Sequence, residues 1–165
     1  MNTIKIYFDG LCEPTNPKGV AVYAFIAFNE KQEELHHDVD LACKPFTPQA
    51  TNNFAEYTAL INALEWAVNN NFNSAEIYGD SKLVVKQVNA EWKIRKPYLM
   101  LLGLRARNLK EKCSASLTWI PREQNHADKL TQDYYREYAR KNGLTKKTIS
   151  EWYSKYRREK DSRLL

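Results

Sequence analysis

Residues 6–17, IYFDGLCEPTNP, pass from an apolar strand to a carboxylate and then to a segment with two prolines. Ile4, Ile6 and Phe8 recur at every second position, which is the period of a β-strand with one buried face. The strand pattern finishes on Asp9, and a carboxylate that is buried without a partner is costly. Asp9 is therefore either an ordinary loop residue or part of a site to which other segments bring further carboxylates.

Two more strand-like runs follow the first one. They cover residues 20–28 and, less clearly, residues 33–42, with breaks at Gly19 and at residues 29–32. Strand patterns separated by such short breaks predict an antiparallel meander of three strands.

Helical and strand patterns alternate in the rest of the chain. Leu60, Ala63 and Leu64 recur at helical spacing and predict a helix over residues 51–70 with one apolar face. The other expected elements are strands over residues 75–80 and 115–120 and helices over residues 81–92, 97–112 and 122–143, the last one ended by Gly143. Strands in succession, followed by alternating strands and helices, imply an α/β fold with a mixed sheet flanked by helices.

The composition sets limits on the class of protein. A chain of 165 residues, 43% hydrophobic and 27% charged, is typical of a single soluble domain, and no apolar run approaches the roughly 20 residues of a membrane span. The amino terminus lacks the pattern of a secretory signal, and the three widely spaced cysteines argue against a disulfide framework and a zinc site. We expect an intracellular, cytoplasmic monomer that is not inserted in a membrane.

Positive charge is concentrated at the carboxyl terminus. From Arg136 to the end there are ten Lys or Arg residues against four Asp or Glu residues, a net charge of +6, so the other 135 residues carry −1 of the total of +5. A basic arm of this kind suits binding to a polyanion, although a solvated helix with a frayed tail has the same composition.

Glu56 is the second carboxylate of interest. It lies four residues before Leu60 and continues the apolar stripe of the helix expected over residues 51–70, so its carboxylate should point towards the sheet. An ionised group in that place needs a cation or a hydrogen-bond donor. The alternative is a Glu that is favourably placed at a helix amino terminus.

Asp80 and Asp128 complete a set of four carboxylates. Asp80 ends a strand at its junction with a helix, and Asp128 lies near the start of the last core helix, where an ordinary capping or surface role is the alternative for both. Two strand ends and two helix starts at one rim of a mixed sheet can bring the four acids together. Oxygen-only ligands favour Mg²⁺ or Mn²⁺, and four carboxylates can hold two such ions about 4 Å apart, as in phosphodiester displacement.

Four ordered motifs resemble those of ribonuclease HI, particularly its compact archaeal-type members. They are YFDGLCEPTNP at residues 7–17, TNNFAEYTAL at 51–60, GDSKLVVKQVNAEWK at 79–93 and WIPREQNHADKL at 119–130. The resemblance covers roughly residues 3–140. It implies the ribonuclease H-like fold, a five-stranded mixed sheet flanked by helices whose first three strands are antiparallel. It also implies a catalytic domain over residues 1–143, followed by a basic helical extension over residues 144–165.

The resemblance further implies an endonuclease that cleaves the RNA strand of RNA/DNA hybrids. Asp9, Glu56, Asp80 and Asp128 would bind two Mg²⁺ ions together with substrate, Mn²⁺ being a substitute, and a metal-activated water would leave a 5′-phosphate and a 3′-hydroxyl. Many bacterial relatives have a catalytic-loop histidine that is absent here. Arg122 is the candidate for its role in releasing the cleaved phosphate, the alternative being a charged residue at a helix start.

The same motifs imply contacts with both strands of a hybrid, which physically should combine RNA 2′-hydroxyl and DNA backbone contacts. The residues expected beside the RNA strand are Gly10, Leu11, Cys12 and Glu13, and those expected at a DNA phosphate are Asn16, Thr51 and Asn52. Asn53 would contact bases or cap the helix. A small aromatic and cationic edge for DNA would be formed by Trp92, Lys93, Arg95 and Lys96. Turn and cap chemistry is the alternative for the Thr and Asn residues, and burial in the core is the alternative for Trp92.

Some questions stay open at this level. His126 either approaches the site or faces solvent, and double-stranded RNA remains open as a further substrate. The basic arm, with Lys146, Lys147, Lys155, Arg157 and Arg158, is expected to strengthen hybrid binding in a salt-dependent way. The alternatives to an enzyme are a catalytically silent binding module on the same fold and, as an origin, a nuclease domain detached from a reverse transcriptase.

Overall fold

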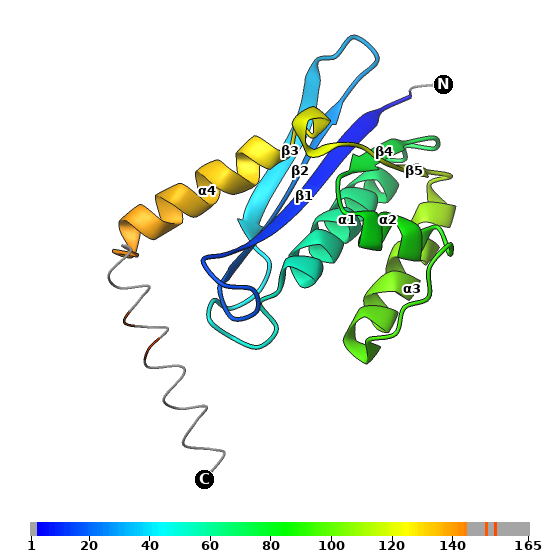
Figure 1. Cartoon of the computed structure of the whole chain (residues 1–165). Coiled ribbons are helices and arrows are strands. Elements are labelled where there is room, and N and C mark those ends of the chain that lie inside the picture. Colours follow the sequence, from blue (N-terminus) through cyan, green and yellow to red (C-terminus); the bar gives the residue numbers. More distant parts are fainter. Residues whose placement is uncertain (1–2, 145–150, 152–153, 155–165) are drawn as a thin grey trace.

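A computed structural model describes residues 3–144 together with residues 151 and 154 (Figure 1). The strands are β1 (Lys5–Glu13), β2 (Val20–Phe28), β3 (Glu34–Leu41), β4 (Glu76–Gly79) and β5 (Ser116–Trp119). The helices are α1 (Asn52–Asn69), α2 (Lys82–Val88), α3 (Pro97–Lys112) and α4 (Asp128–Lys141), with a short 3₁₀ helix η1 (Arg122–Gln124). The predicted α/β fold with a five-stranded sheet is confirmed.

The sheet is mixed, with the strand order β3-β2-β1-β4-β5. β1, β2 and β3 pair antiparallel, as the meander predicted, whereas β4 pairs parallel with both β1 and β5. Antiparallel neighbours need only short turns, but parallel neighbours need a crossover, which α1 supplies before β4 and which α2 and α3 supply before β5.

The two faces of the sheet are covered differently. Figure 1 shows α4 on one face and α1, α2 and α3 on the other. Ile6 and Phe8 of β1 are fully buried in the same core cluster as Leu60 and Leu64 of α1. Each large apolar side chain buried in this way contributes roughly 1.5–3 kcal/mol of transfer free energy. Because side chains alternate along a strand, Asp9 points to the face of α4.

The first strand does not end at Asp9, as the sequence pattern suggested. β1 continues to Glu13, and its register with β2 is unbroken over the whole strand. On its other side, the ladder with β4 stops where Phe8 pairs with Gly79. Among the described residues, the second half of β1 therefore has a strand neighbour on one side only, and its open edge adjoins the site described below.

Gly10 explains how α1 reaches this open edge. A β-carbon on Gly10 would overlap the backbone nitrogen of Glu56 and would lie 2.8 Å from the Glu56 α-carbon. Only glycine therefore allows β1 and α1 to approach this closely. The contact sets Glu56 directly beside the residue that follows Asp9.

The helices α1, α2, α3 and α4 end in the same type of turn. The residue after each carboxyl-terminal cap is left-handed, and its amide and the next one return to carbonyls of the last turn, which is a Schellman motif. Gly143 occupies this position after α4, as predicted. The helix expected over residues 81–92 ends already at Val88, because Ala90 takes the left-handed conformation (φ 60°) and the Glu91 amide donates to the Lys86 carbonyl over 2.9 Å.

The last helix also differs from the prediction, since α4 begins at Asp128 and not at Arg122. The Asn125 side chain accepts a hydrogen bond from the Ala127 amide (3.1 Å) and donates one to the Phe8 carbonyl (2.9 Å). A side chain that bonds to nearby backbone in this way competes with the helical ladder. The result is a short irregular segment that ties the start of α4 to β1.

The basic extension lies almost entirely outside the described residues. Only Glu151 and Ser154 are described beyond Leu144, and both are helical. The predicted role of Lys146, Lys147, Lys155, Arg157 and Arg158 therefore stays a prediction. Within the described part of the chain, no helix combines the length and the apolar character needed to cross a bilayer.

Candidate active site

Three of the four predicted carboxylates converge. Asp9 from β1, Glu56 from α1 and Asp80, which follows β4, each offer one oxygen within 4.8 Å of the other two. Asp9 is 4% exposed and Glu56 is 3% exposed. Asp80 is not the helix cap that the sequence left open, because the side chain of Ser81 caps α2 by accepting from the Val84 amide.

Hydrogen bonding within this cluster is incomplete. Asp9 Oδ2 accepts a 2.6 Å hydrogen bond from Thr131 Oγ1, and this bond connects the strand to α4. Glu56 Oε2 is buried and has no hydrogen-bond partner among the described residues. A buried carboxylate oxygen without a partner is rare because its desolvation is not compensated. A bound cation would supply the missing interaction.

The electrostatics of the three acids point the same way. Burial raises the pKa of Asp9 to about 7; the Thr131 hydrogen bond opposes this shift, and the Asp80 carboxylate adds to it. Burial and then the charges of Asp9 and Asp80 raise the pKa of Glu56 well above its ordinary value. Burial, followed by the charge of Asp128, raises the pKa of Asp80. Without a cation, the cluster therefore resists full ionisation.

These raised pKa values predict that the stability of the ion-free protein depends on pH. The pKa of Asp9 is near its ordinary value of 3.8 in the unfolded chain and about 7 in the folded chain. Between these values the folded state keeps a proton that the unfolded state has lost, so the free energy of unfolding falls as the pH rises. The Asp9 contribution to this loss is about 4 kcal/mol above pH 7.

Urea denaturation in EDTA at pH 4 and pH 8 measures this effect. The free energy of unfolding of the wild-type protein should fall more between the two pH values than that of Asp9→Asn, which has no titrating group there. Added Mg²⁺ should recover part of the wild-type loss at pH 8. An equal fall in both proteins would show that Asp9 does not titrate in this way.

The fourth carboxylate, Asp128, lies outside the group of three. Its Oδ1 accepts from Arg122 Nε over 3.1 Å, and its Oδ2 accepts from Gln132 Nε2 over 3.1 Å. Its charge nevertheless acts on the cluster, since it contributes to raising the pKa values of Asp9 and Asp80. The structure thus places Asp128 beside the site, with both of its oxygens engaged by side chains.

The acids open into a hollow of about 410 Å³. The residues that line it are Asp9, Gly10, Leu11, Cys12, Glu13, Asn52, Glu56, Asp80, Ser81, Trp119 and Arg122. All four residues expected beside RNA are among them, and they belong to β1 and not to a loop. The Cys12 thiol donates to the Ala50 and Thr15 carbonyls, which agrees with a packing role.

The residues expected at a DNA phosphate lie at the amino terminus of α1. Asn16 Oδ1 accepts from the Asn52 amide over 3.0 Å, and Thr51 Oγ1 accepts from the Phe54 amide over 3.0 Å. Turn and cap chemistry therefore describes Asn16 and Thr51 in the free protein. Asn53 is not the cap, because Thr51 takes that role.

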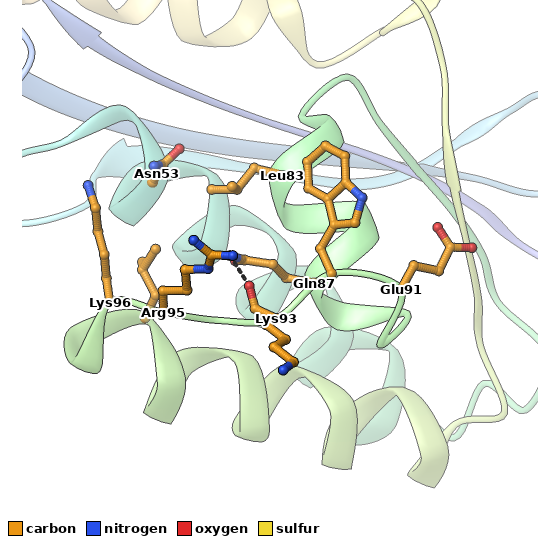
Figure 2. Close-up of a pocket in the computed structure, with 9 residues that line it drawn as sticks. Asn53, Leu83, Gln87, Glu91, Lys93, Arg95 and Lys96 are labelled. Atoms are coloured by element: carbon orange, nitrogen blue, oxygen red, sulfur yellow. Dashed lines mark hydrogen bonds between the residues drawn. The ribbon is translucent and has the colours of Figure 1, made fainter.

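A second groove of about 530 Å³ runs between α1, α2 and α3 (Figure 2). The residues that line it are Asn53, Leu83, Gln87, Glu91, Trp92, Lys93, Arg95, Lys96 and Leu99. Figure 2 shows Lys96 and Asn53 at one side, Glu91 at the other, and Arg95 and Gln87 between them. Trp92 is 46% exposed and is not a core residue, so that alternative is wrong.

Gln87 holds the floor of this groove in place. It is 4% exposed, accepts from the Tyr57 hydroxyl over 2.7 Å and donates to the Lys93 carbonyl over 3.4 Å. The guanidinium of Arg107 donates to the Gln87 carbonyl over 2.6 Å. These bonds connect α1, α2 and α3 to the segment that carries Trp92 and Lys93.

Of its two expected positions, His126 takes the solvent-exposed one. Its ring packs edge-on against Tyr7 at 4.5 Å and against Phe28 at 5.5 Å, on the face of the sheet that α4 leaves open.

Sequence reasoning missed four residues at or beside the site, which are Thr131, Gln132, Asn125 and Trp119. Thr131 and Gln132 follow Asp128 by three and four residues, a helical spacing that places them on one face and could have identified them.

A divalent ion fits the three-carboxylate cluster. Its donors are all oxygens, which hard ions such as Mg²⁺ and Mn²⁺ prefer, and the Glu56 oxygen that has no partner in the described part of the chain is available to such an ion. Asp9, Glu56 and Asp80 would hold the ion.

Comparisons with known proteins agree with this arrangement. The family model described as reverse transcriptase-like matches residues 33–133. The bifunctional protein Rv2228c of Mycobacterium tuberculosis is 38% identical over 100 residues, which are 59% of this chain and 28% of that protein. Ribonuclease HI of Halobacterium salinarum is 44% identical over 87 residues, or 52% of this chain and 44% of that protein. The chain thus matches less than half the length of these relatives.

Solved structures match over longer stretches. The amino-terminal RNase H domain of Rv2228c aligns with a TM-score of 0.73 and 29% identity, covering 86% of this chain and 99% of that chain. RNase H1 of Halobacterium salinarum aligns at 0.68 and 34% identity, covering 78% and 93%. LC11-RNase H1, solved with an RNA/DNA hybrid, aligns at 0.66 and 30% identity, covering 78% and 92%. The chain therefore belongs to the ribonuclease HI proteins of the reverse transcriptase-like family.

Proposed function

We propose that this protein is an endonuclease that hydrolyses the RNA strand of RNA/DNA hybrids with the help of two divalent ions. The observation that carries the proposal is the cluster of Asp9, Glu56 and Asp80 at the open edge of β1, in which Asp9 and Glu56 are buried and one Glu56 oxygen has no partner among the described residues. The hybrid bound by LC11-RNase H1, a relative of similar fold, supports the class of substrate.

The reaction needs charge neutralisation more than a nucleophilic side chain. Asp9, Glu56 and Asp80 would hold one ion. The same residues together with Asp128 would hold a second ion. Bound Mg²⁺ or Mn²⁺ would supply a nucleophile from water and stabilise charge on the leaving oxygen, giving a 5′-phosphate and a 3′-hydroxyl. Thr131 keeps Asp9 oriented through its 2.6 Å hydrogen bond.

The two hollows suggest how the strands would be distinguished. The backbone of residues 10–13 lines the hollow at the acids and would run beside the RNA, where 2′-hydroxyl groups identify the strand. The groove of Trp92 and Lys93 would take the DNA strand, by stacking on an exposed ring and by attraction of phosphates to cations. Arg122 lines the hollow at the acids and would receive the cleaved phosphate.

The test uses end-labelled duplexes of one sequence, in RNA/DNA, RNA/RNA and DNA/DNA forms, incubated with Mg²⁺, Mn²⁺ or EDTA. We expect cutting of the RNA strand of the hybrid, with either metal but not with EDTA, and ligatable 5′-phosphate ends. The double-stranded RNA arm answers whether that substrate is also cut. Hybrid binding without cutting under any metal condition would contradict the proposal and favour the silent binding module.

A further inference from the structure

Arg122 and Asp128 form an ion pair at the rim of the hollow. The Nε–Oδ1 distance is 3.1 Å, and the second Asp128 oxygen accepts from Gln132. Asp128 thus differs from Glu56, whose Oε2 has no partner in the described structure. Three carboxylates are available to a metal ion, whereas the fourth is already paired with the guanidinium of Arg122.

The charge of Arg122 reaches the whole cluster. Its guanidinium opposes the rise in the pKa values of Asp9, Glu56 and Asp80, and its strongest electrostatic partner is Asp128. Among the described residues that line the hollow, Arg122 is the only one with a positive charge. It therefore supplies the counter-charge that the acids have before any ion binds.

We propose that Arg122 competes with the second divalent ion for Asp128, so that the two ions bind in a fixed order. The first ion binds to Asp9, Glu56 and Asp80, which need no rearrangement. The second binds only after Arg122 has released Asp128. This inference rests on the two-ion site of the proposed function and adds to it a residue that controls when the second ion binds.

The pair is suited to such an exchange because it is easily opened. The Arg122 side chain is 65% exposed and that of Asp128 is 25% exposed, so solvent screens the attraction between them. A phosphate is an alternative partner for a guanidinium, which binds it through two parallel hydrogen bonds. A substrate phosphate arriving at the rim would therefore draw Arg122 away and free Asp128, coupling substrate binding to the second ion.

Mn²⁺ binding in the absence of nucleic acid tests the competition without relying on activity. Bound Mn²⁺ is counted by electron paramagnetic resonance over a titration of wild type, Arg122→Ala and Arg122→Lys. We expect Arg122→Ala to tighten the weaker site about tenfold and the tighter site by much less, because Arg122 contacts Asp128 directly and acts on the other three acids only through its charge. Arg122→Lys, which keeps the charge but loses the planar fork, should gain less. The control Arg140→Ala, which removes an equal charge paired with Glu137, should change neither site.

A double-mutant cycle with Asp128→Asn attributes the effect to the pair. Asp128→Asn should weaken the second ion, and adding Arg122→Ala to it should restore little. Unchanged second-site affinity in Arg122→Ala, or equal tightening of both sites, would overturn the competition while leaving the nuclease proposal intact. Absence of any Mn²⁺ binding in both wild type and Arg122→Ala would instead overturn the metal site itself, and the competition with it.

Discussion

Asp9→Asn should lower the rate of hybrid cleavage by about a thousandfold or more while leaving hybrid binding intact. Asparagine has nearly the shape of aspartate, and its carbonyl oxygen can still accept the 2.6 Å hydrogen bond from Thr131, so the fold should persist. The substitution removes one negative charge from a buried site that has three carboxylates within 4.8 Å of one another. An ion held there would lose the charge of one of its ligands, and that ligand is the central carboxylate of the site.

Single-turnover cleavage and fluorescence anisotropy separate the two quantities. Cleavage is measured with saturating enzyme in Mg²⁺, and binding of the labelled hybrid is measured in EDTA. Asp133→Asn is the matched control, because this aspartate lies on the exposed side of α4 and pairs only with Arg136 in the described contacts. Cleavage by Asp9→Asn within tenfold of wild type would remove Asp9 from the site.

Gly10→Ala should be the most disruptive single-methyl substitution at the site. The added carbon would overlap the backbone of Ala55 and Glu56, and backbone cannot rotate out of the way as a side chain can. We expect a loss of about 3 kcal/mol in the free energy of unfolding, together with a loss of cleavage, because α1 must move away from β1. Glu56 would then be displaced from Asp9.

Urea denaturation and the cleavage assay measure both effects. Gly143→Ala is a useful comparison, since a β-carbon there meets no atom of the described residues within 4 Å but is strained by the left-handed backbone (φ +61°). It should cost only about 1 kcal/mol and leave cleavage unchanged. If Gly10→Ala were as mild as Gly143→Ala, β1 and α1 could separate without harm to the site.

Periodic patterns predicted most of the fold. The α3 helix begins and ends where the sequence placed it, at Pro97 and Lys112, and the apolar stripe of α1 correctly predicted that Glu56 would face the sheet. These are local properties, set by side-chain spacing and by residues that start helices. The limits of β1 are different, because its continuation past Asp9 depends on pairing with β2.

The ends of the helices show the same difference between features set by local residue types and features set by packing. Gly143 was identified because glycine is the residue that tolerates a left-handed backbone best. Ala90 adopts the same conformation without any signal in its residue type, so the end of α2 was placed too late. Packing of the following segment, and the hydrogen bonds of its amides, decide that turn.

The candidate site was predicted as a set of acids but not as a geometry. Order and context identified Asp9, Glu56 and Asp80, whose convergence the structure bears out. The ion pair that separates Asp128 from them could not be predicted from the sequence, because it depends on the irregular segment around Asn125. Nor could the bond from Thr131 to Asp9, which joins residues 122 positions apart.

That long-range bond has a consequence for when activity can begin. A growing or refolding chain that has completed the sheet together with α1 brings Asp9, Glu56 and Asp80 to the site, but it lacks the docked helix α4 that brings Thr131 and Asp128. On the proposed mechanism such a chain would bind RNA beside an incomplete set of metal ligands, and it would become a nuclease only when α4 docks. Cleavage should therefore be the last property to return during refolding, later than the circular dichroism signal of the sheet and the other helices.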